Sequence, residues 1–261
     1  MLAGLPLVGF GQSTWVGGVS QDWNNAANWS SSPANPTGNF FINTNATGVY
    51  PVLGANSAFS PVDINIGTAT NSGRLDQTAG TLATGSGNWM FVGRNGTGAY
   101  NLTGGSLTAG QLNIAYTDGT AIATGAVTVA NATINTTGAL FVENGRNINS
   151  TCTGTLDVGA GATVNTEGDI VMAFAGDVNS TATMNIASGA TVNQATTTKR
   201  WFIVSQWDLL SGTLNVNGGT LNLNANTDLR YSTGNNSGVN TVNLNSGAIT
   251  LWSGNQANPT T

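Results

Sequence analysis

The sequence predicts an all-β fold, a parallel β-helix (β-solenoid) of about seven three-strand coils with a tryptophan-rich N-terminal cap. The first observation is alternation: in residues 211–229, Leu214 and Val216 precede a glycine pair, and Leu221 and Leu223 follow it. Alternation with period two predicts half-buried strands. The second observation is that this unit recurs about every 23 to 31 residues, a period typical of solenoids. The third is that no helical spacing competes with it.

Three series of apolar positions carry the repeat from Ile64 onward. The first series consists of pairs, which are Tyr100/Leu102, Val127/Val129, Leu156/Val158, Met184/Ile186, Leu214/Val216 and Val242/Leu244. The second series follows a turn that usually contains glycine, and comprises Leu82, Leu107, Ile134, Val164, Val192, Leu221 and Ile249. The third comprises Trp89/Phe91, Leu112/Ile114, Leu140/Val142, Ile170/Met172, Trp201/Ile203 and Leu229/Tyr231. One coil cannot bury its own apolar face, so we expect residues 64–252 to form stacked coils.

The repeats are preceded by residues 15–63, which we expect to contain the cap and the first strands. Trp15, Trp23 and Trp29 lie there among glycines and asparagines. Large aromatic side chains can close the open end of a repeat core. Tryptophan faces also stack on pyranose rings, so a glycan contact is the second interpretation.

The first fourteen residues form an apolar segment without charge, whose apolar side chains are Leu2, Leu5, Leu7, Val8 and Phe10. The segment fits the remnant of a secretory signal peptide, and it is too short to span a membrane. It also fits a strand donated to a neighbouring copy, or one that packs on its own domain. Pro6 restricts such a strand to an edge position.

The other end of the repeats is a candidate acceptor for such a strand. After Ile249 no third strand completes the last coil, and we expect residues 253–261 to form a tail. An uncovered solenoid end exposes backbone groups that can template another chain. The predicted acceptor residues are Val242, Leu244, Ile249, Leu251 and Trp252.

Composition restricts the partners. Charged residues make up only 7% of the chain, the net charge is -5 and histidine is absent. A chain without a basic cluster is a poor ligand for nucleic acid, and the surface of amides and hydroxyls suits an extracellular protein. Cys152 is the only cysteine, so an intrachain disulfide cannot form.

The acidic residues are scattered over different coils, so the sequence predicts no enzyme, no cofactor and no metal site. Catalytic sites on polysaccharide need clustered carboxylates. Asp169, Arg200 and Asp228 share one edge in neighbouring coils, which predicts a ladder of charges. Arg94, Glu143 and Arg146 follow the same strand in earlier coils, and we expect similar exposed pairs there; such pairs stabilise little.

The opening stretch WVGGVSQDWNNAANWS, the later YPVL and the serial GTL and SGATVN repeats resemble secreted bacterial proteins with autotransporter-type β-strand repeats. Many members of this group are anchor-sorted surface or matrix proteins. The resemblance implies a right-handed parallel β-helix and secretion. From the sequence we expect neither a C-terminal sorting helix nor a translocating barrel, and in this the chain departs from the pattern.

Together these features predict a structural subunit of an extracellular bacterial filament or surface matrix. Subunits would polymerise end to end by stacking of β-helices, with strand donation from residues 2–10. Extracellular polysaccharide is the alternative partner, with an adhesin that uses exposed tryptophans; the candidates are Trp15, Trp23, Trp29, Trp201, Trp207 and Trp252.

Overall fold

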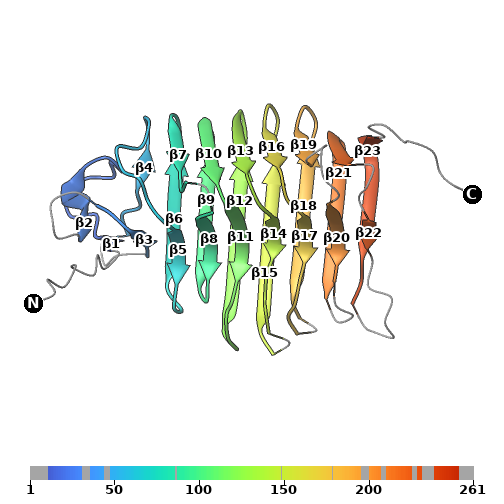
Figure 1. Ribbon diagram of the computed structural model, residues 1–261, viewed down its shortest axis with the longest axis horizontal. Helices are drawn as coiled ribbons and strands as arrows, with labels where there is room; N and C mark the ends of the chain where they lie inside the picture. The colour runs from blue at the N-terminus through green and yellow to red at the C-terminus, as the bar shows by residue number, and fades with distance from the viewer. Residues whose placement is uncertain are drawn as a thin grey trace, which may run out of the picture.

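The chain winds into a parallel β-solenoid of about seven turns, which confirms the predicted fold (Figure 1). The computed structural model describes residues 11–30, 36–43, 48–85, 87–147, 149–177, 179–194, 200–206, 210–224, 228–230 and 238–252, without the side chains of 224, 228–230 and 251–252. Among these residues a single 3-10 turn, η1 (Ala26–Asn28), is the only helical element, so no helix there is long and apolar enough to cross a membrane.

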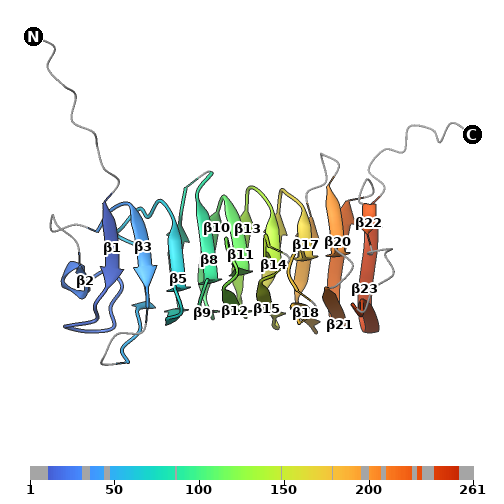
Figure 2. The same ribbon diagram turned by 90° about the horizontal axis from the view of Figure 1, so that it is seen from below.

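Ten strands form the first stack, which runs along the long axis of the molecule (Figure 2). In chain order they are β1 (Gln12–Trp15), β2 (Trp29–Ser30), β3 (Asn39–Ile42), β5 (Ile64–Thr68), β8 (Trp89–Arg94), β11 (Gln111–Tyr116), β14 (Leu140–Glu143), β17 (Ile170–Ala173), β20 (Trp201–Ser205) and β22 (Asp228–Arg230). All neighbours are parallel except β1 and β2, which pair antiparallel at the N-terminal end. This stack is the third series of the sequence pattern.

The second and third stacks belong to one 13-stranded sheet. The second stack contains β4 (Val52–Leu53), β6 (Ser72–Gln77), β9 (Thr97–Leu102), β12 (Ile122–Val129), β15 (Thr151–Val158) and β18 (Thr181–Ala187). The third contains β7 (Thr81–Ala83), β10 (Gly105–Ala109), β13 (Ala132–Thr136), β16 (Thr163–Thr166) and β19 (Thr191–Gln194). The long strands β21 (Ser211–Asn224) and β23 (Thr241–Trp252) run through both stacks, with a bulge where β21 turns the corner.

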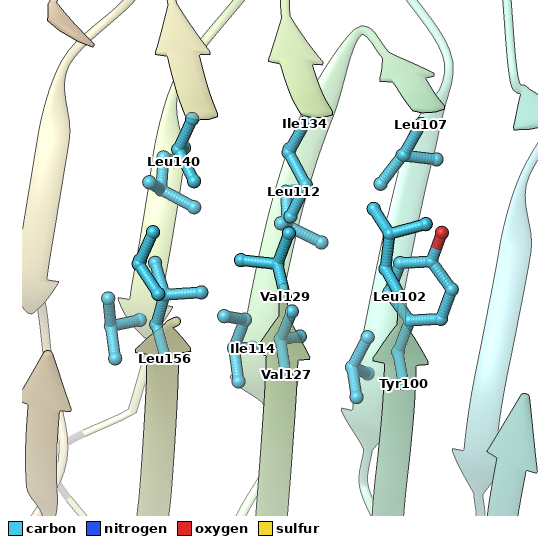
Figure 3. Close-up of a cluster of buried hydrophobic side chains, with 14 of the residues drawn as sticks. Tyr100, Leu102, Leu107, Leu112, Ile114, Val127, Val129, Ile134, Leu140 and Leu156 are labelled. Carbon is cyan, nitrogen blue, oxygen red and sulfur yellow. The ribbon is translucent and has the colours of Figure 1, made fainter. Parts of the chain in front are cut away.

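Equivalent residues of successive coils form columns inside the solenoid. Tyr100, Val127 and Leu156 are in register in the second stack, and each is fully buried (Figure 3). Burial of such a side chain stabilises the fold by about 1.5–3 kcal/mol. The columns join into one core that extends from Trp15 to Leu223, so each coil depends on its neighbours for burial.

Gln77 takes a core position in this pattern, and its contacts explain how a polar residue is accommodated there. It is fully buried, in register with Leu102. Its Oε1 accepts a hydrogen bond from the Tyr100 hydroxyl at 2.6 Å, and its Nε2 donates to the carbonyls of Gly80 and Ser106. Because its polar groups are satisfied, the buried amide avoids the cost of a missing partner.

The first stack corrects the predicted face of two strands. In β8 the core residues are Met90 and Val92, and in β20 they are Phe202 and Val204, all fully buried. The predicted pairs Trp89/Phe91 and Trp201/Ile203 therefore lie on the outer side. A shift of one residue moves every side chain of a strand to the other face. Tyr231, predicted in the last strand of this series, lies outside the described residues.

The second stack packs directly on the backbone of the first at one corner of several coils. A Cβ placed at Gly154 would lie 1.7 Å from the Val142 carbonyl oxygen, and one at Gly125 would lie 2.3 Å from the Val92 oxygen. Only glycine allows this close approach of two backbones. Glycine is therefore required by packing rather than by a turn in these coils, whereas Ala182 takes the equivalent position in β18.

Candidate functional site

The strongest candidate site is the end of the solenoid formed by β22 and β23. Among the described residues β23 pairs only with β21, and β22 pairs only with β20. Each of these strands therefore has an edge without a strand partner in the described part of the chain. Such an edge presents backbone N–H and C=O groups that another strand can use.

The apolar core is open at the same end. Leu244 is 53% exposed, whereas Val216, the residue in register with it in β21, is fully buried. Val242 and Ile249 are half-buried and pack against the core from the last coil. The exposure arises because no further coil covers β23 in the described structure. An additional strand that covered Leu244 would bury apolar surface.

Three of the predicted acceptor residues, Val242, Leu244 and Ile249, thus lie together at this end. Leu251 and Trp252 lie on the same strand, in register with Leu223 and Asn224, and their side chains are outside the described part. The proposed donor residues Leu2, Leu5, Leu7, Val8 and Phe10 are also outside the described residues.

Ladders of asparagine amides run toward the open end. In one, Asn215 Nδ2 donates to Asn185 Oδ1 and Asn243 Nδ2 donates to Asn215 Oδ1, both at 2.8 Å. In a second ladder, Asn245 Nδ2 donates to Asn217 Oδ1 at 2.7 Å. Every amide donates toward the preceding coil, so the Oδ1 atoms of Asn243 and Asn245 are left as acceptors that no described residue uses.

The three cap tryptophans close the opposite end of the core. Trp15, Trp23 and Trp29 are 2%, 0% and 4% exposed. The Trp29 ring meets the other two edge to face, with ring centroids 5.1 Å from Trp15 and 4.8 Å from Trp23. Edge-to-face packing is a favourable aromatic geometry.

All three indole N–H groups have partners within the cap. Trp15 Nε1 donates to the Val49 carbonyl, Trp23 Nε1 to the Ser57 hydroxyl and Trp29 Nε1 to the Trp23 carbonyl, at 2.8–2.9 Å. The rings have no face open to solvent on which a sugar could stack. Their burial therefore suits closure of the core rather than contact with a glycan.

Other aromatic residues lie on the outer side of the first stack. Trp201 is 38% exposed and Trp89 is half-buried, whereas Trp207 lies outside the described residues. Arg94 lies over the Phe91 ring at 4.8 Å and over the Tyr116 ring at 5.8 Å. The sequence pattern missed this cluster because it placed Phe91 in the core.

The predicted charge ladder is not formed between Asp169 and Arg200. Asp169 Oδ1 accepts the backbone N–H of Trp201 at 2.8 Å, and Arg200 Nε donates to the Glu167 carbonyl. The side chain of Asp228 is outside the described part. Within the described part the ion pairs are Arg74–Asp76 at 2.7 Å and Arg94–Asp118 at 3.4 Å.

Glu143 was predicted to be an exposed, paired charge, and its position differs most from that prediction. The residue is fully buried, and its Oε2 accepts a hydrogen bond from the Phe174 N–H at 2.8 Å. Its Oε1 has no hydrogen-bond partner among the described residues. Burial raises the pKa of Glu143 to about 8 and also raises the pKa of the neighbouring Cys152 thiol.

No three cysteine or acidic side chains in the described ranges come close enough to hold a metal ion. The fold places the chain among the β-solenoid repeat proteins. No family model, curated protein or solved structure matches it.

Proposed function

We propose that the protein is a structural subunit of an extracellular bacterial filament or surface matrix. In this proposal the β23 end of one copy receives the apolar segment of residues 2–10 from the next copy as an added strand. The observation that carries the proposal is the exposed Leu244 at the end of a column that is otherwise fully buried.

The length and chemistry of the donor segment support the pairing. Nine residues in extended conformation span about 30 Å, enough to follow most of one strand of the last coil and its corner. The apolar side chains of the segment match the apolar surface of Val242, Leu244 and Ile249. Pro6 lacks an N–H, so its position in the added strand must face away from β23 or fall at a bend.

The composition supports an extracellular setting. With 7% charged residues, the outer surface is formed mainly by hydroxyls and amides. The resemblance to secreted proteins with autotransporter-type repeats points the same way. From the same resemblance we also propose that the coils wind in a right-handed sense.

A pair of aspartate variants tests the acceptor end. Leu244→Asp places a charge at the open end of the core, and we expect it to abolish end-to-end assembly in electron micrographs and light scattering. Ile122→Asp is the matched control, because Ile122 is 70% exposed but lies in the middle of the solenoid. Assemblies of normal length from Leu244→Asp would refute the proposed acceptor.

A carbohydrate-binding adhesin is the second candidate, and one observation favours it. Trp201 exposes 38% of its surface on the outer side of the first stack, near the half-buried Asp169. Glycan-array binding that is lost in Trp201→Ala, by a protein that stays monomeric, would support this function over the structural one.

A further inference from the structure

The outer face of the third stack carries two columns of uncharged polar side chains, which we name the Thr/Asn lattice. The first column consists of Thr81, Ser106, Thr133, Thr163, Thr191 and Thr220. The second column, two residues further along each strand from β10 onward, consists of Thr108, Asn135, Asn165, Asn193 and Asn222. Figure 1 shows β7, β10, β13, β16 and β19 in one row, so both columns run along the solenoid.

The strand register fixes the spacing of this lattice. Neighbouring coils are about 4.8 Å apart, and residues i and i+2 of one strand are about 6.6 Å apart. Six ranks from Thr81 to Thr220 therefore cover about 24 Å of the solenoid. The result is a nearly rectangular net of hydroxyl and amide groups.

The side chains of the lattice are held in place. Asn165 donates to Asn135, Asn193 to Asn165 and Asn222 to Asn193, with Nδ2–Oδ1 distances of 2.8–2.9 Å. These bonds orient each amide along the column and leave one N–H and one lone pair of each inner amide for other partners. The threonines are β-branched, which restricts rotation about χ1.

The groups of the lattice are available to a ligand. Thr133, Thr163 and Thr191 are half-exposed residues, and no hydrogen bond joins their hydroxyls to another described residue. Neither column contains a charged side chain. The outer face of the second stack also carries threonines, but two of its columns contain charged side chains, which are Arg74, Asp76 and Asp157.

The absence of charge and the regular spacing of the lattice indicate which kind of ligand it can bind. A charged ligand would find no opposite charge in the lattice, and a single polymer chain would match its repeat in one direction only. Hexagonal ice is uncharged and repeats in two directions. Its prism face presents oxygens in a rectangular net whose two repeat distances are close to those of the lattice, and each oxygen donates and accepts hydrogen bonds.

We propose that the Thr/Asn lattice binds the surface of ice. Each hydroxyl or amide holds a water molecule in a position that continues the ice net, and the threonine methyl groups cover the gaps between them. Ordered water bridges of this kind are nearly as favourable as direct hydrogen bonds. This binding uses the side of the solenoid and is independent of assembly at its ends.

Ice-binding assays on the whole protein test the proposal. We expect the protein to shape ice crystals, to open a gap between freezing and melting temperatures and to inhibit ice recrystallisation. Thr163→Lys, at the centre of the lattice, should remove all three effects. Thr128→Lys is the matched control, because Thr128 is an exposed threonine on the outer face of the second stack, in a column that contains Asp76 and Asp157.

One further variant and a spectroscopic control separate loss of the fold from loss of the ice-binding face. Thr163→Ser keeps the hydroxyl and should retain a reduced gap, and circular dichroism should show the same β content in all variants. The proposal is overturned if the wild-type protein leaves ice growth unchanged, or if Thr163→Lys and Thr128→Lys behave alike. It is also overturned if Thr163→Lys changes only the oligomeric state, because the face would then pack against another copy.

Discussion

The buried carboxyl group of Glu143 predicts that the protein loses stability as the pH rises. Its pKa is raised from 4.5 to about 8 by burial. Below about pH 4.5 both the folded and the unfolded chain hold the proton, so the group has no effect on folding. Between these values the unfolded chain releases the proton and the folded chain keeps it. The free energy of unfolding therefore falls by about 1.4 kcal/mol per pH unit.

The whole change amounts to roughly 5 kcal/mol between pH 4.5 and pH 8. For a chain of 261 residues that unfolds in one transition, this corresponds to a decrease of about 9 °C in melting temperature. Above pH 8 the folded chain ionises as well, and the contribution of this group becomes constant.

Glu143→Gln removes the titration and keeps an oxygen that can accept the Phe174 N–H. We expect this variant to match the wild type near pH 4.5 and to be more stable at pH 8, as measured by urea unfolding at each pH. Glu167→Gln is the control, because Glu167 is exposed and the change removes the same charge. If the free energy of unfolding depends on pH equally in the wild type and in Glu143→Gln, the raised pKa of Glu143 is refuted.

Three further experiments probe the packing. Gly154→Ala should destabilise the fold by about 1–3 kcal/mol, because the added Cβ meets the Val142 carbonyl. Gly119→Ala is the control: the space around Gly119 is open, so its free energy of unfolding should stay within about 0.5 kcal/mol of the wild type. Equal unfolding midpoints of the two variants would contradict this. Trp23→Ala should cost about 3–5 kcal/mol, because the ring is fully buried in the cap; calorimetry would show the loss. Cys152 should react with a thiol reagent at pH 8 only after unfolding, since the thiol is fully buried and burial raises its pKa; rapid labelling of the native protein would disagree.

The sequence predicted the coil pattern well where apolar and polar residues alternate. Met184 and Ile186 are flanked by threonine and asparagine, so only one face of that strand can be buried. The stretch from Trp89 to Val92 is apolar at every position. Periodicity cannot assign its faces, and tertiary packing placed Met90 rather than Trp89 in the core.

The polar interior could not be predicted in the same way. A glutamate is usually exposed, and nothing in the sequence around Glu143 shows that the corner of the coil closes over it. The open end is different, because the apolar pattern of the last coil was visible in the sequence. The exposure of Leu244 required the structure, since it depends on whether another segment of the chain covers β23.

The central claim is that the β23 end of one copy receives the N-terminal segment of another, and mixing two variants tests it most directly. A chain without residues 1–11 keeps the acceptor end but has no donor segment, whereas Leu244→Asp keeps the donor segment but has a blocked acceptor end. Sedimentation should show that each variant alone is monomeric and that the mixture forms one-to-one dimers without longer species. Dimers of the truncated chain alone, or no dimers in the mixture, would contradict the claim.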